Sequence, residues 1–579
     1  MVHSSGEALK LKVISHLSVI YPDFDVEAMA KAIIHEMGLD EDWVKPTSHG
    51  NRWDERDIWV ITYGDSIKNP NCVPLHSLSQ FLHRYLIGLV NGVHILPFFP
   101  YSSDDGFSVI DFSQVNESLG SWSDITDISK DFHLMADLVV NHCSSRSIWF
   151  ENFKKCVDPG RHYFVCVDDD YDVSKVVRPR TSPLLREVET LEGKKKVWCT
   201  FSHDQVDLNY ENPDLLIEMI RTIKLYLDYG VRIFRLDAVA FLWKESGTDC
   251  IHLKQTHEMV RLFRTLIEHH SDDAIIITET NVPNNENLSY LGNANEAHAV
   301  YNFSLPPLLI QALISESCQH LKQWLSSMPA LQMGTFYFNF IASHDGIGLR
   351  PAEGLLATDE ISAMVNCMKE FGGRISWRST DEGLDKPYEM NITLFDALQG
   401  TLKGPDRWQI QRFLCAHAIM LALEGVPAIY IHSLLGTQNF YQGVEHTSQN
   451  RTINRYKWDE EELNQLLSTD SHHKEVFDGI RELMAIRREQ SCFHPNAEQY
   501  LLHISDEIFG FWRQNIQRTE RVFCLFNVSS QPQTLDMTCL NLHADHPWRD
   551  LISGQVFTDV FGSMQLSPYQ SIWLKSCPS

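Results

Sequence analysis

The stretch LLIEMIRTIKLYLDYGVRIFRLDAV, residues 215–239, contains the pattern of a helix followed at once by the pattern of a strand. In residues 215–230 the apolar side chains are spaced three and four apart and the segment ends at a glycine, which is typical of a helix packed on a core. Residues 231–239 form a short, β-branched apolar run that contains an arginine and an aspartate. Such a run predicts a strand buried on both faces, as in a parallel sheet.

Seven further apolar runs of this kind occur along the chain, so there are eight candidate strands. The others are DIWVITYGD (57–65), VHILPFFP (93–100), LMADLVVNH (134–142), AIIITETN (274–281), AVYNF (299–303), FYFNFIASHD (336–345) and VPAIYIHSLLG (426–436). Helical patterns at residues 253–270 and 406–425 precede the fifth and the eighth run. Strands and helices alternating in this way predict an α/β fold, the (β/α)8 or TIM barrel.

The barrel pattern is interrupted twice and is flanked on both sides. Polar segments at residues 143–210 and 346–405 follow the third and seventh strands, and they are too long to be simple connections, so we expect lids or small subdomains there. Short β-like runs separated by turn residues predict an antiparallel C-terminal β domain in residues 491–579. Residues 1–50 are expected to form a helical extension. The barrel itself is then expected in residues 51–142, 211–345 and 406–490.

The composition excludes several classes of protein. Of the 579 residues, 43% are hydrophobic and 22% charged, which is ordinary for a globular protein. With 49 Lys and Arg against 76 Asp and Glu, the formal net charge is −27. A surface this acidic repels nucleic acid and anionic lipid, so neither is an expected partner. A few local arginines can still bind an anionic substrate.

The cysteines and the N-terminal segment indicate a cytoplasmic protein. The 13 cysteines are scattered and contain no CxxC pair, so neither a zinc site nor a redox site is expected. No secretory signal pattern is present, and no run of about 18 apolar residues could span a membrane. We therefore expect a soluble cytoplasmic protein without a membrane partner, either a monomer or a homodimer.

Charged and polar side chains gather at the carboxyl ends of the predicted strands, which form the active face of such a barrel. They are Asp104 and Phe107 after the second run, His142 at the end of the third, Arg235 and Asp237 in the fourth, Glu279 in the fifth, and His344 and Asp345 in the seventh. Glycoside cleavage with retention needs one carboxylate as nucleophile and one carboxylic acid as proton donor. An adjacent arginine lowers a carboxyl pKa, so Arg235 is expected to keep Asp237 ionised, whereas burial and a neighbouring carboxylate raise the pKa of a proton donor. Structural salt bridging at the barrel rim is the alternative.

Several segments resemble a known clan. DLVVNH (137–142), FRLDAV (234–239), ITETN (277–281) and ASHDGIG (342–348) resemble the four conserved regions of the α-amylase clan of retaining glycoside hydrolases. Three further segments resemble its sucrose phosphorylase-like branch, namely PFFPYSSDDGFSVIDFSQVNESLGSW (97–122), FSHDQVDLNYENP (201–213) and NRTINR (450–455). Within that branch, ASHDGIGLRPAEG and GTQNFYQGVEHTSQNRTINRYKW look similar to glucosylglycerol and glucosylglycerate phosphorylases.

The resemblance implies a role for each matching residue. Asp237 matches the nucleophile that forms a glucosyl–enzyme ester, Glu279 the general acid/base, and Asp345 the carboxylate that holds the 2- and 3-hydroxyls of the sugar. Arg235 matches the arginine that holds the nucleophile ionised. The remaining matches bind the glucose ring: His142 and His344 its hydroxyls, Asp104 and Arg451 its 4-hydroxyl end, and Phe107 as an aromatic wall. Phe107 could equally be a packing residue.

The predicted activity is that of a retaining α-glucoside phosphorylase, which transfers glucose to phosphate and releases α-D-glucose 1-phosphate. Arg350 and the 436–451 loop, which includes Glu445, are the candidates for binding phosphate and the acceptor. A glycerol-type acceptor is favoured, with glycerate next. The alternatives are sucrose or sucrose 6-phosphate phosphorylase, a hydrolase or transglucosidase of the same clan, and an inactive barrel that only binds.

No cofactor is expected, and inorganic phosphate is a substrate. Many members of the clan use the asparagine at the position of Asn141 as a calcium ligand, and the residue is present here. No compact loop of oxygen ligands of the calcium type is visible, however, so no metal is predicted.

Overall fold

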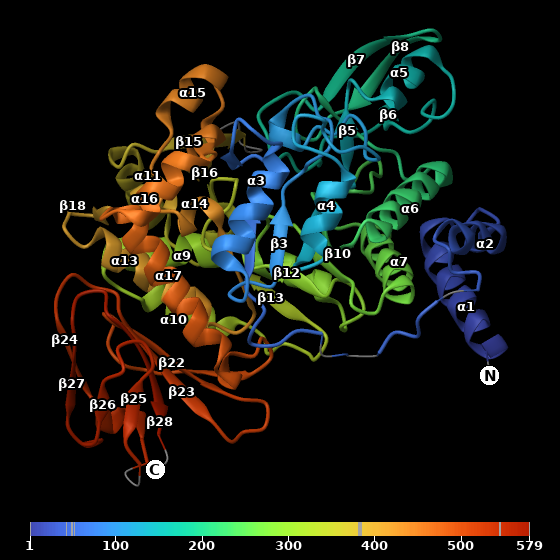
Figure 1. The fold of residues 1–579 in the computed structure, drawn as a ribbon. Coiled ribbons are helices and arrows are strands. Elements are labelled where there is room, and N and C mark those ends of the chain that lie inside the picture. The colour runs from blue at the N-terminus through green and yellow to red at the C-terminus, as the bar shows by residue number, and fades with distance from the viewer. Residues whose placement is uncertain are drawn as a thin grey trace.

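The computed structural model describes residues 2–41, 43–47, 50, 52–379, 385–543 and 546–577. Eight strands, all paired in parallel with their neighbours, close into a barrel at the centre of the molecule (Figure 1). They are β1 (Trp59–Thr62), β3 (Gly92–Ile95), β4 (His133–Val139), β10 (Val231–Asp237), β11 (Ile275–Thr278), β12 (Ala299–Tyr301), β13 (Phe336–Asn339) and β19 (Val426–Tyr430). Each of the eight predicted runs overlaps one of these strands. The predicted barrel is confirmed.

Helices surround the barrel and cover its strands. The longer ones are α3 (Pro74–Phe81), α4 (Trp122–Ser129), α6 (Pro213–Asp228), α7 (Lys254–His270), α9 (Leu305–Ser315), α13 (Gln409–Ala422), α16 (Glu460–Ser468) and α17 (His472–Arg488). Helix α6 shows how the sequence sets these elements. It begins at Pro213, with the Asn212 side chain accepting a hydrogen bond from the N–H of Asp214, and it ends just before Gly230, whose φ is +93°.

Close packing inside the barrel requires a glycine at one position. The indole of Trp59 lies against Gly92, at the start of the neighbouring strand β3. A Cβ atom at this glycine would lie 2.2 Å from Trp59 Cδ1. Only glycine therefore allows the large side chain to fill the barrel interior at this level.

Two insertions lie beyond the carboxyl ends of β4 and β13, in the upper part of Figure 1. The first contains β5 (His142–Ser144), α5 (Ile148–Lys155), β6 (Cys166–Val167), β7 (Leu185–Thr190), β8 (Gly193–Trp198) and β9 (Gln205–Asp207). The second contains β14 (Ile347–Gly348), α11 (Thr358–Glu370), β15 (Arg374–Ser379), β16 (Asp385–Asn391), α12 (Leu394–Ala397), β17 (Gly400–Thr401) and β18 (Gly404–Pro405). Each insertion thus has secondary structure of its own.

The N-terminal segment packs on the outside of the barrel. It holds helices α1 (Val2–Ile20) and α2 (Val26–Glu36). His16 of α1 lies 2.6 Å from Glu258 Oε1 and 3.0 Å from Thr265 Oγ1, both on α7. Arg221 of α6 donates to both carboxylate oxygens of Glu36, so α2 is also tied to the barrel.

The C-terminal region is antiparallel, as predicted, and lies at the lower left of Figure 1. Its larger sheet contains β21 (Glu498–Leu501), β22 (Ile508–Gln514), β23 (Arg521–Asn527), β28 (Ser571–Ser576), β25 (Trp548–Asp550) and β26 (Val556–Phe557). Strands β24 (Gln533–Asp536) and β27 (Ser563–Leu566) form a second sheet. Leu525, Leu535 and Met564 belong to an apolar core of this region. The remaining short elements are β2 (Ile67–Lys68), α8 (Asn284–Leu288), α10 (Gln319–Ser327), α14 (Ile431–Leu434), α15 (Tyr441–Thr447) and β20 (Trp458–Asp459).

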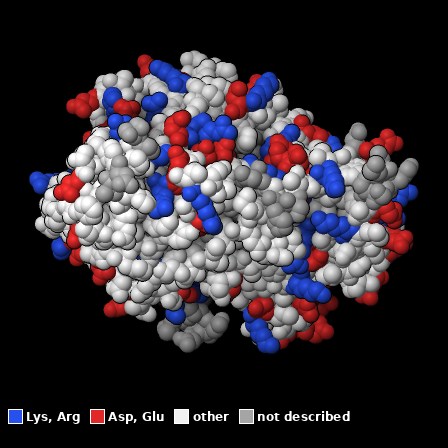
Figure 2. Space-filling model, turned by 90° about the horizontal axis from the view of Figure 1, so that it is seen from below, with Lys and Arg blue, Asp and Glu red and all other residues white. Residues whose placement is uncertain are grey.

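Two surface properties bear on the expected partners. Within the described part of the chain, no helix is both long enough and apolar enough to cross a membrane. Figure 2 shows one face of the molecule, on which basic and acidic side chains are interspersed among large areas that carry neither. The net negative charge is therefore not gathered into a single patch on this face.

Candidate active site

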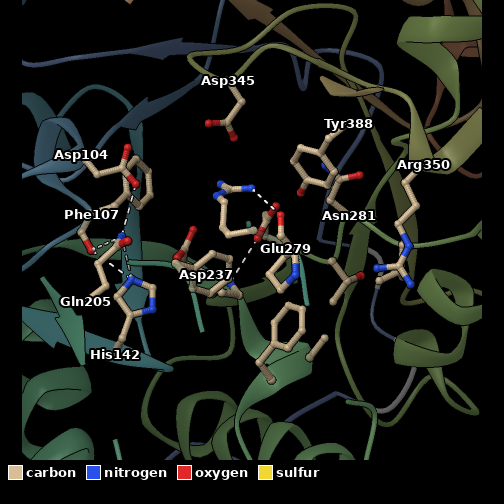
Figure 3. Close-up of a pocket in the computed structure, with 18 of the residues that line it drawn as sticks. Asp104, Phe107, His142, Gln205, Asp237, Glu279, Asn281, Asp345, Arg350 and Tyr388 are labelled. Atoms are coloured by element: carbon tan, nitrogen blue, oxygen red, sulfur yellow. Dashed lines mark hydrogen bonds between the residues drawn. The ribbon is translucent and has the colours of Figure 1, made fainter. Parts of the chain in front are cut away.

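A pocket of about 700 Å³ opens at the carboxyl ends of the barrel strands (Figure 3). It brings together most of the residues predicted from the sequence, although they come from distant parts of the chain. The predicted residues that line it are Asp104, Phe107, His142, Asp237, Glu279, His344, Asp345, Arg350 and Arg451. Arg235 lies buried beneath the pocket, whereas Glu445 is exposed on α15 and does not line it.

Strand β10 places Arg235 and Asp237 on one face, because side chains alternate along a strand. Arg235 Nη1 donates to Asp237 Oδ1 at 2.6 Å and also to the buried Asp137. Burial raises the pKa of Asp237, and the charge of Arg235 offsets only part of that rise. The cost of burying the carboxylate is the larger effect on this pKa, while the ion pair with Arg235 acts in the opposite direction and favours the ionised form.

Glu279, just after β11, is held beside Asp237. Its Oε2 accepts a hydrogen bond from the N–H of Ala238 at 3.1 Å, and its Oε1 lies 3.9 Å from Arg235 Nη2. Burial raises the pKa of Glu279 to about 7. The charges of Asp237 and Asp345 add to this rise, and the charge of Arg235 offsets part of it. A carboxyl group with this pKa is partly protonated at neutral pH and can serve as a proton donor.

Asp345 has the opposite environment. Although burial raises its pKa, the charge of Arg451 above all holds the pKa of Asp345 well below its usual range. Arg451 Nη1 lies 2.6 Å from Asp345 Oδ1, and Arg455 Nη2 lies 3.8 Å from the same oxygen. The site therefore contains one carboxyl group poised near neutrality, Glu279, and one that stays ionised, Asp345.

One side of the pocket is built by Asp104 and its neighbours, on the left in Figure 3. Gln205 Nε2 donates to Asp104 Oδ2 at 3.2 Å and lies 3.3 Å from His142 Nε2. The Phe107 ring stacks on His344 with centroids 5.0 Å apart and an interplanar angle of 8°. Gln205 was not predicted, although it lies in the quoted segment 201–213, because a single glutamine in a polar insertion gives no signal of its own.

Two further arginines line the pocket. Arg350 lies at the far right in Figure 3, beyond Asn281 and Tyr388. Arg180, from the first insertion, also lines the pocket, and its guanidinium lies 5.2 Å from the Tyr388 ring centroid and 5.6 Å from that of Phe201. Within the described residues, neither Arg180 nor Arg350 forms an ion pair with a carboxylate. Their positive charges are thus available to an anion.

Asn141, the position of interest for a metal, is bound to a lysine. Its Oδ1 accepts a hydrogen bond from Lys244 Nζ at 2.8 Å, and the same Nζ lies 2.7 Å from Asp207 Oδ2. All three side chains are buried. In the described part of the chain, no group of three or more His, Cys, Asp and Glu residues is arranged to hold a metal ion.

Comparisons with known proteins agree with this geometry. The model of the α-amylase catalytic domain matches residues 82–347. A glucosylglycerate phosphorylase of Spirochaeta thermophila is 44% identical over 532 residues, covering 90% of each chain. One of Escherichia coli is 41% identical over 90% of this chain and 92% of its own. The crystal structure of sucrose 6F-phosphate phosphorylase from Thermoanaerobacter thermosaccharolyticum has a TM-score of 0.71 at 25% identity and covers 82% of this chain and 94% of its own.

The comparisons do not support glycerol as the favoured acceptor. A glucosylglycerol phosphorylase of Marinobacter adhaerens is only 29% identical, over 76% of this chain and 89% of its own. The similarity to glucosylglycerate phosphorylases is therefore much greater. The preference for glycerol rests on the lack of an arginine that the sequence alone assigns to an acceptor carboxylate, and the pocket contains two arginines, Arg180 and Arg350.

Proposed function

Because this chain belongs to the glucoside phosphorylases of the sucrose phosphorylase-like branch of the α-amylase clan, which are glycosyltransferase-type enzymes, we propose that it is a glucosylglycerate phosphorylase. In this proposal it transfers glucose reversibly from an α-glucoside of glycerate to phosphate. The observation that carries the choice of glycerate is that two arginines without a carboxylate partner among the described residues line the pocket. Arg350 lies on the side away from Asp104 in Figure 3, and Arg180 lies over the rings of Phe201 and Tyr388. A carboxylate is a natural partner for arginine, whereas the neutral glycerol is not.

In the first step of the proposed reaction, Asp237 attacks the anomeric carbon of glucose. The bond from that carbon to the glycerate oxygen breaks, and the Glu279 carboxyl group gives its proton to this oxygen. Glycerate leaves with its hydroxyl restored, and a covalent glucosyl ester of Asp237 remains. The pKa of about 7 for Glu279 suits this role, because a large fraction of the enzyme carries the proton at neutral pH.

In the second step, phosphate takes the place of glycerate. Glu279, now ionised, accepts the proton of a phosphate hydroxyl while that oxygen attacks the anomeric carbon and the ester bond to Asp237 breaks. Two inversions give α-D-glucose 1-phosphate with net retention. Asp345, ionised because of Arg451, is assigned to the sugar hydroxyls, together with Asp104, His142 and His344, and no metal takes part in this scheme.

The proposal gives one anion site to both acceptors. Glycerate and phosphate bind in alternate steps and both are anions, so the same pair, Arg180 and Arg350, can hold each in turn. A local pair of arginines overcomes the general repulsion from a chain with a net charge of −27. Water lacks the charge that would make it a competitive occupant of such a site.

Reverse phosphorolysis tests the proposal. The purified enzyme is given glucose 1-phosphate with glycerate, glycerol, fructose or fructose 6-phosphate in turn, and the release of phosphate is measured. We expect glycerate to react about 10- to 100-fold faster than glycerol, the factor for a hydrogen bond to a charged group. A higher rate with fructose 6-phosphate would indicate a sucrose 6-phosphate phosphorylase, and phosphate release at the same rate without any acceptor would indicate a hydrolase.

A further inference from the structure

Glu389 is a buried carboxylate next to the active site that the proposed mechanism does not use. It lies on β16 of the second insertion and is 3% exposed. Its Oε1 accepts hydrogen bonds from Arg451 Nε at 3.1 Å and from the N–H of Gly346, and its Oε2 accepts one from Arg451 Nη2 at 3.0 Å. The carboxylate therefore binds one whole edge of the Arg451 guanidinium.

The other edge of the same guanidinium faces the substrate pocket. Arg451 Nη1 lies 2.6 Å from Asp345 Oδ1. Glu389 does not line that pocket. It lines an adjoining cavity that shares Asn281, Asp345 and Arg451 with the pocket. Contact between Glu389 and the substrate pocket is thus made through Arg451.

The backbone beside Asp345 is shaped to admit Glu389. Gly346 directly follows Asp345, and a Cβ atom at this glycine would lie 2.6 Å from Glu389 Cγ. Any other residue there would push the carboxylate away from the N–H of residue 346 and from Arg451. The glycine in the ASHDGIG segment is therefore needed for this contact.

We infer that Glu389 is a positioning residue that fixes Arg451 so that Nη1 holds Asp345 in the orientation needed for glucosyl transfer. A guanidinium is planar and its N–H groups point in fixed directions. Once Nε and Nη2 are bound by Glu389, the position of Nη1, which forms an ion pair with Asp345 Oδ1, is set as well. The inference rests on the proposed function only in giving Asp345 a part in glucosyl transfer, and it is independent of the identity of the acceptor.

The test is Glu389→Gln, which keeps the shape but turns an amide donor toward Arg451. The readout is the hydrolysis of glucose 1-phosphate in the absence of any acceptor, which needs the glucose and phosphate parts of the site but no glycerate. We expect kcat to fall about 10- to 100-fold, the usual effect of losing a charged hydrogen-bond partner. The KM for glucose 1-phosphate should change by less than about threefold, and the ratio of transfer to glycerate and to glycerol should not change.

Asp406→Asn serves as the matched control. Asp406 lies 2.5 Å from Nη2 of the buried Arg412, outside the pocket, so this change also removes the carboxylate partner of a buried arginine. It should leave kcat unchanged. Thermal unfolding is measured for both variants, and Glu389→Asp, which retains the charge but withdraws the carboxylate, is made alongside them and should show an intermediate loss of kcat.

A double-mutant cycle separates positioning from a merely structural role. In the Arg451→Met background there is no guanidinium to direct, so Glu389→Gln should lower kcat by less than about threefold. An equal loss in both backgrounds overturns the inference, as does an unchanged kcat in folded Glu389→Gln or Glu389→Asp. Failure of glycerate in the acceptor panel would refute the proposed function alone, because the hydrolysis readout contains no acceptor.

Discussion

Replacing Glu279 with glutamine should separate two kinds of substrate. Cleavage of glucosylglycerate, whose leaving alkoxide needs a proton, should be slowed about 100- to 10,000-fold, the range for loss of a general acid. Cleavage of an aryl α-glucoside with a stable phenolate leaving group should be slowed less than about tenfold. The reason is that glutamine has nearly the shape of Glu279 but cannot donate the proton.

The pKa of Glu279 shows how strongly its surroundings favour the protonated form. The usual pKa of a glutamate side chain is 4.5, and the site raises that of Glu279 to about 7. At pH 7 a group with the usual value is protonated in only about 0.3% of molecules, whereas Glu279 is protonated in about half of them. The surroundings of Glu279 therefore increase the population of the acid form by roughly two orders of magnitude.

The pH dependence follows with a definite sign. Because the first step needs protonated Glu279, kcat/KM for glucosylglycerate should fall about tenfold per pH unit above pH 7. Initial rates of glucose 1-phosphate formation between pH 5.5 and 9 measure this pH dependence. The same rates are measured with the aryl glucoside as the donor, for the wild type and for Glu279→Gln. Glu462→Gln, a change at an exposed glutamate outside the pocket, is the control. Equal losses with both donors, or a wild-type profile flat from pH 6 to 9, would refute the assignment of Glu279 as the acid.

The remaining predictions concern the acceptor and the buried lysine. Arg350→Ala should lower transfer to glycerate about 10- to 100-fold relative to transfer to glycerol in reverse phosphorolysis. Arg518→Ala, at an exposed arginine, is the control. An unchanged ratio of the two transfer rates would show that other residues select the acceptor. Glu445→Ala should leave that ratio within about twofold, because this side chain is exposed on α15; a larger change would bring it back to the acceptor site. Dialysis against a strong chelator should not change the activity, and loss of activity restored by calcium would contradict this expectation. Lys244→Met should lower the free energy of unfolding in urea by about 3–5 kcal/mol, because it leaves the buried Asp207 without its cationic partner, and an unchanged midpoint would contradict it.

The barrel and the carboxylates that line its pocket could be predicted because both depend on local patterns. A buried parallel strand is a continuous apolar run, and its carboxyl end in this fold lies at the active face. Asp237 lies at such an end, Glu279 directly follows one, and Asp345 follows β13 after a short segment, so the sequence places them at the same face of the barrel without any knowledge of the insertions. Arg235 could be paired with Asp237 for the same reason, since residues two apart on a strand share a face.

The residues that were missed lie in the insertions. Arg180, Gln205, Tyr388 and Glu389 reach the pocket or its border only through the packing of two long segments, for which no periodic pattern exists. Burial was also missed, because it depends on the whole fold. The sequence shows that Arg235 lies near Asp237, but only the structure shows that the loss of solvent at Asp237 outweighs the charge of Arg235.

This division between strands and insertions explains how one site can serve different acceptors. In our proposal the nucleophile and the acid come from the ends of barrel strands, and the insertion residue Glu389 acts only on Arg451, which forms ion pairs with both Glu389 and Asp345. Arg180, Arg350 and Tyr388, which surround the acceptor in our proposal, all come from the insertions. Changes in the insertions can therefore alter the acceptor while the glucose chemistry stays the same. A solved structure named for sucrose 6F-phosphate, and relatives named for glycerate and glycerol, match this chain along most of its length at 25% to 44% identity, as such a division predicts.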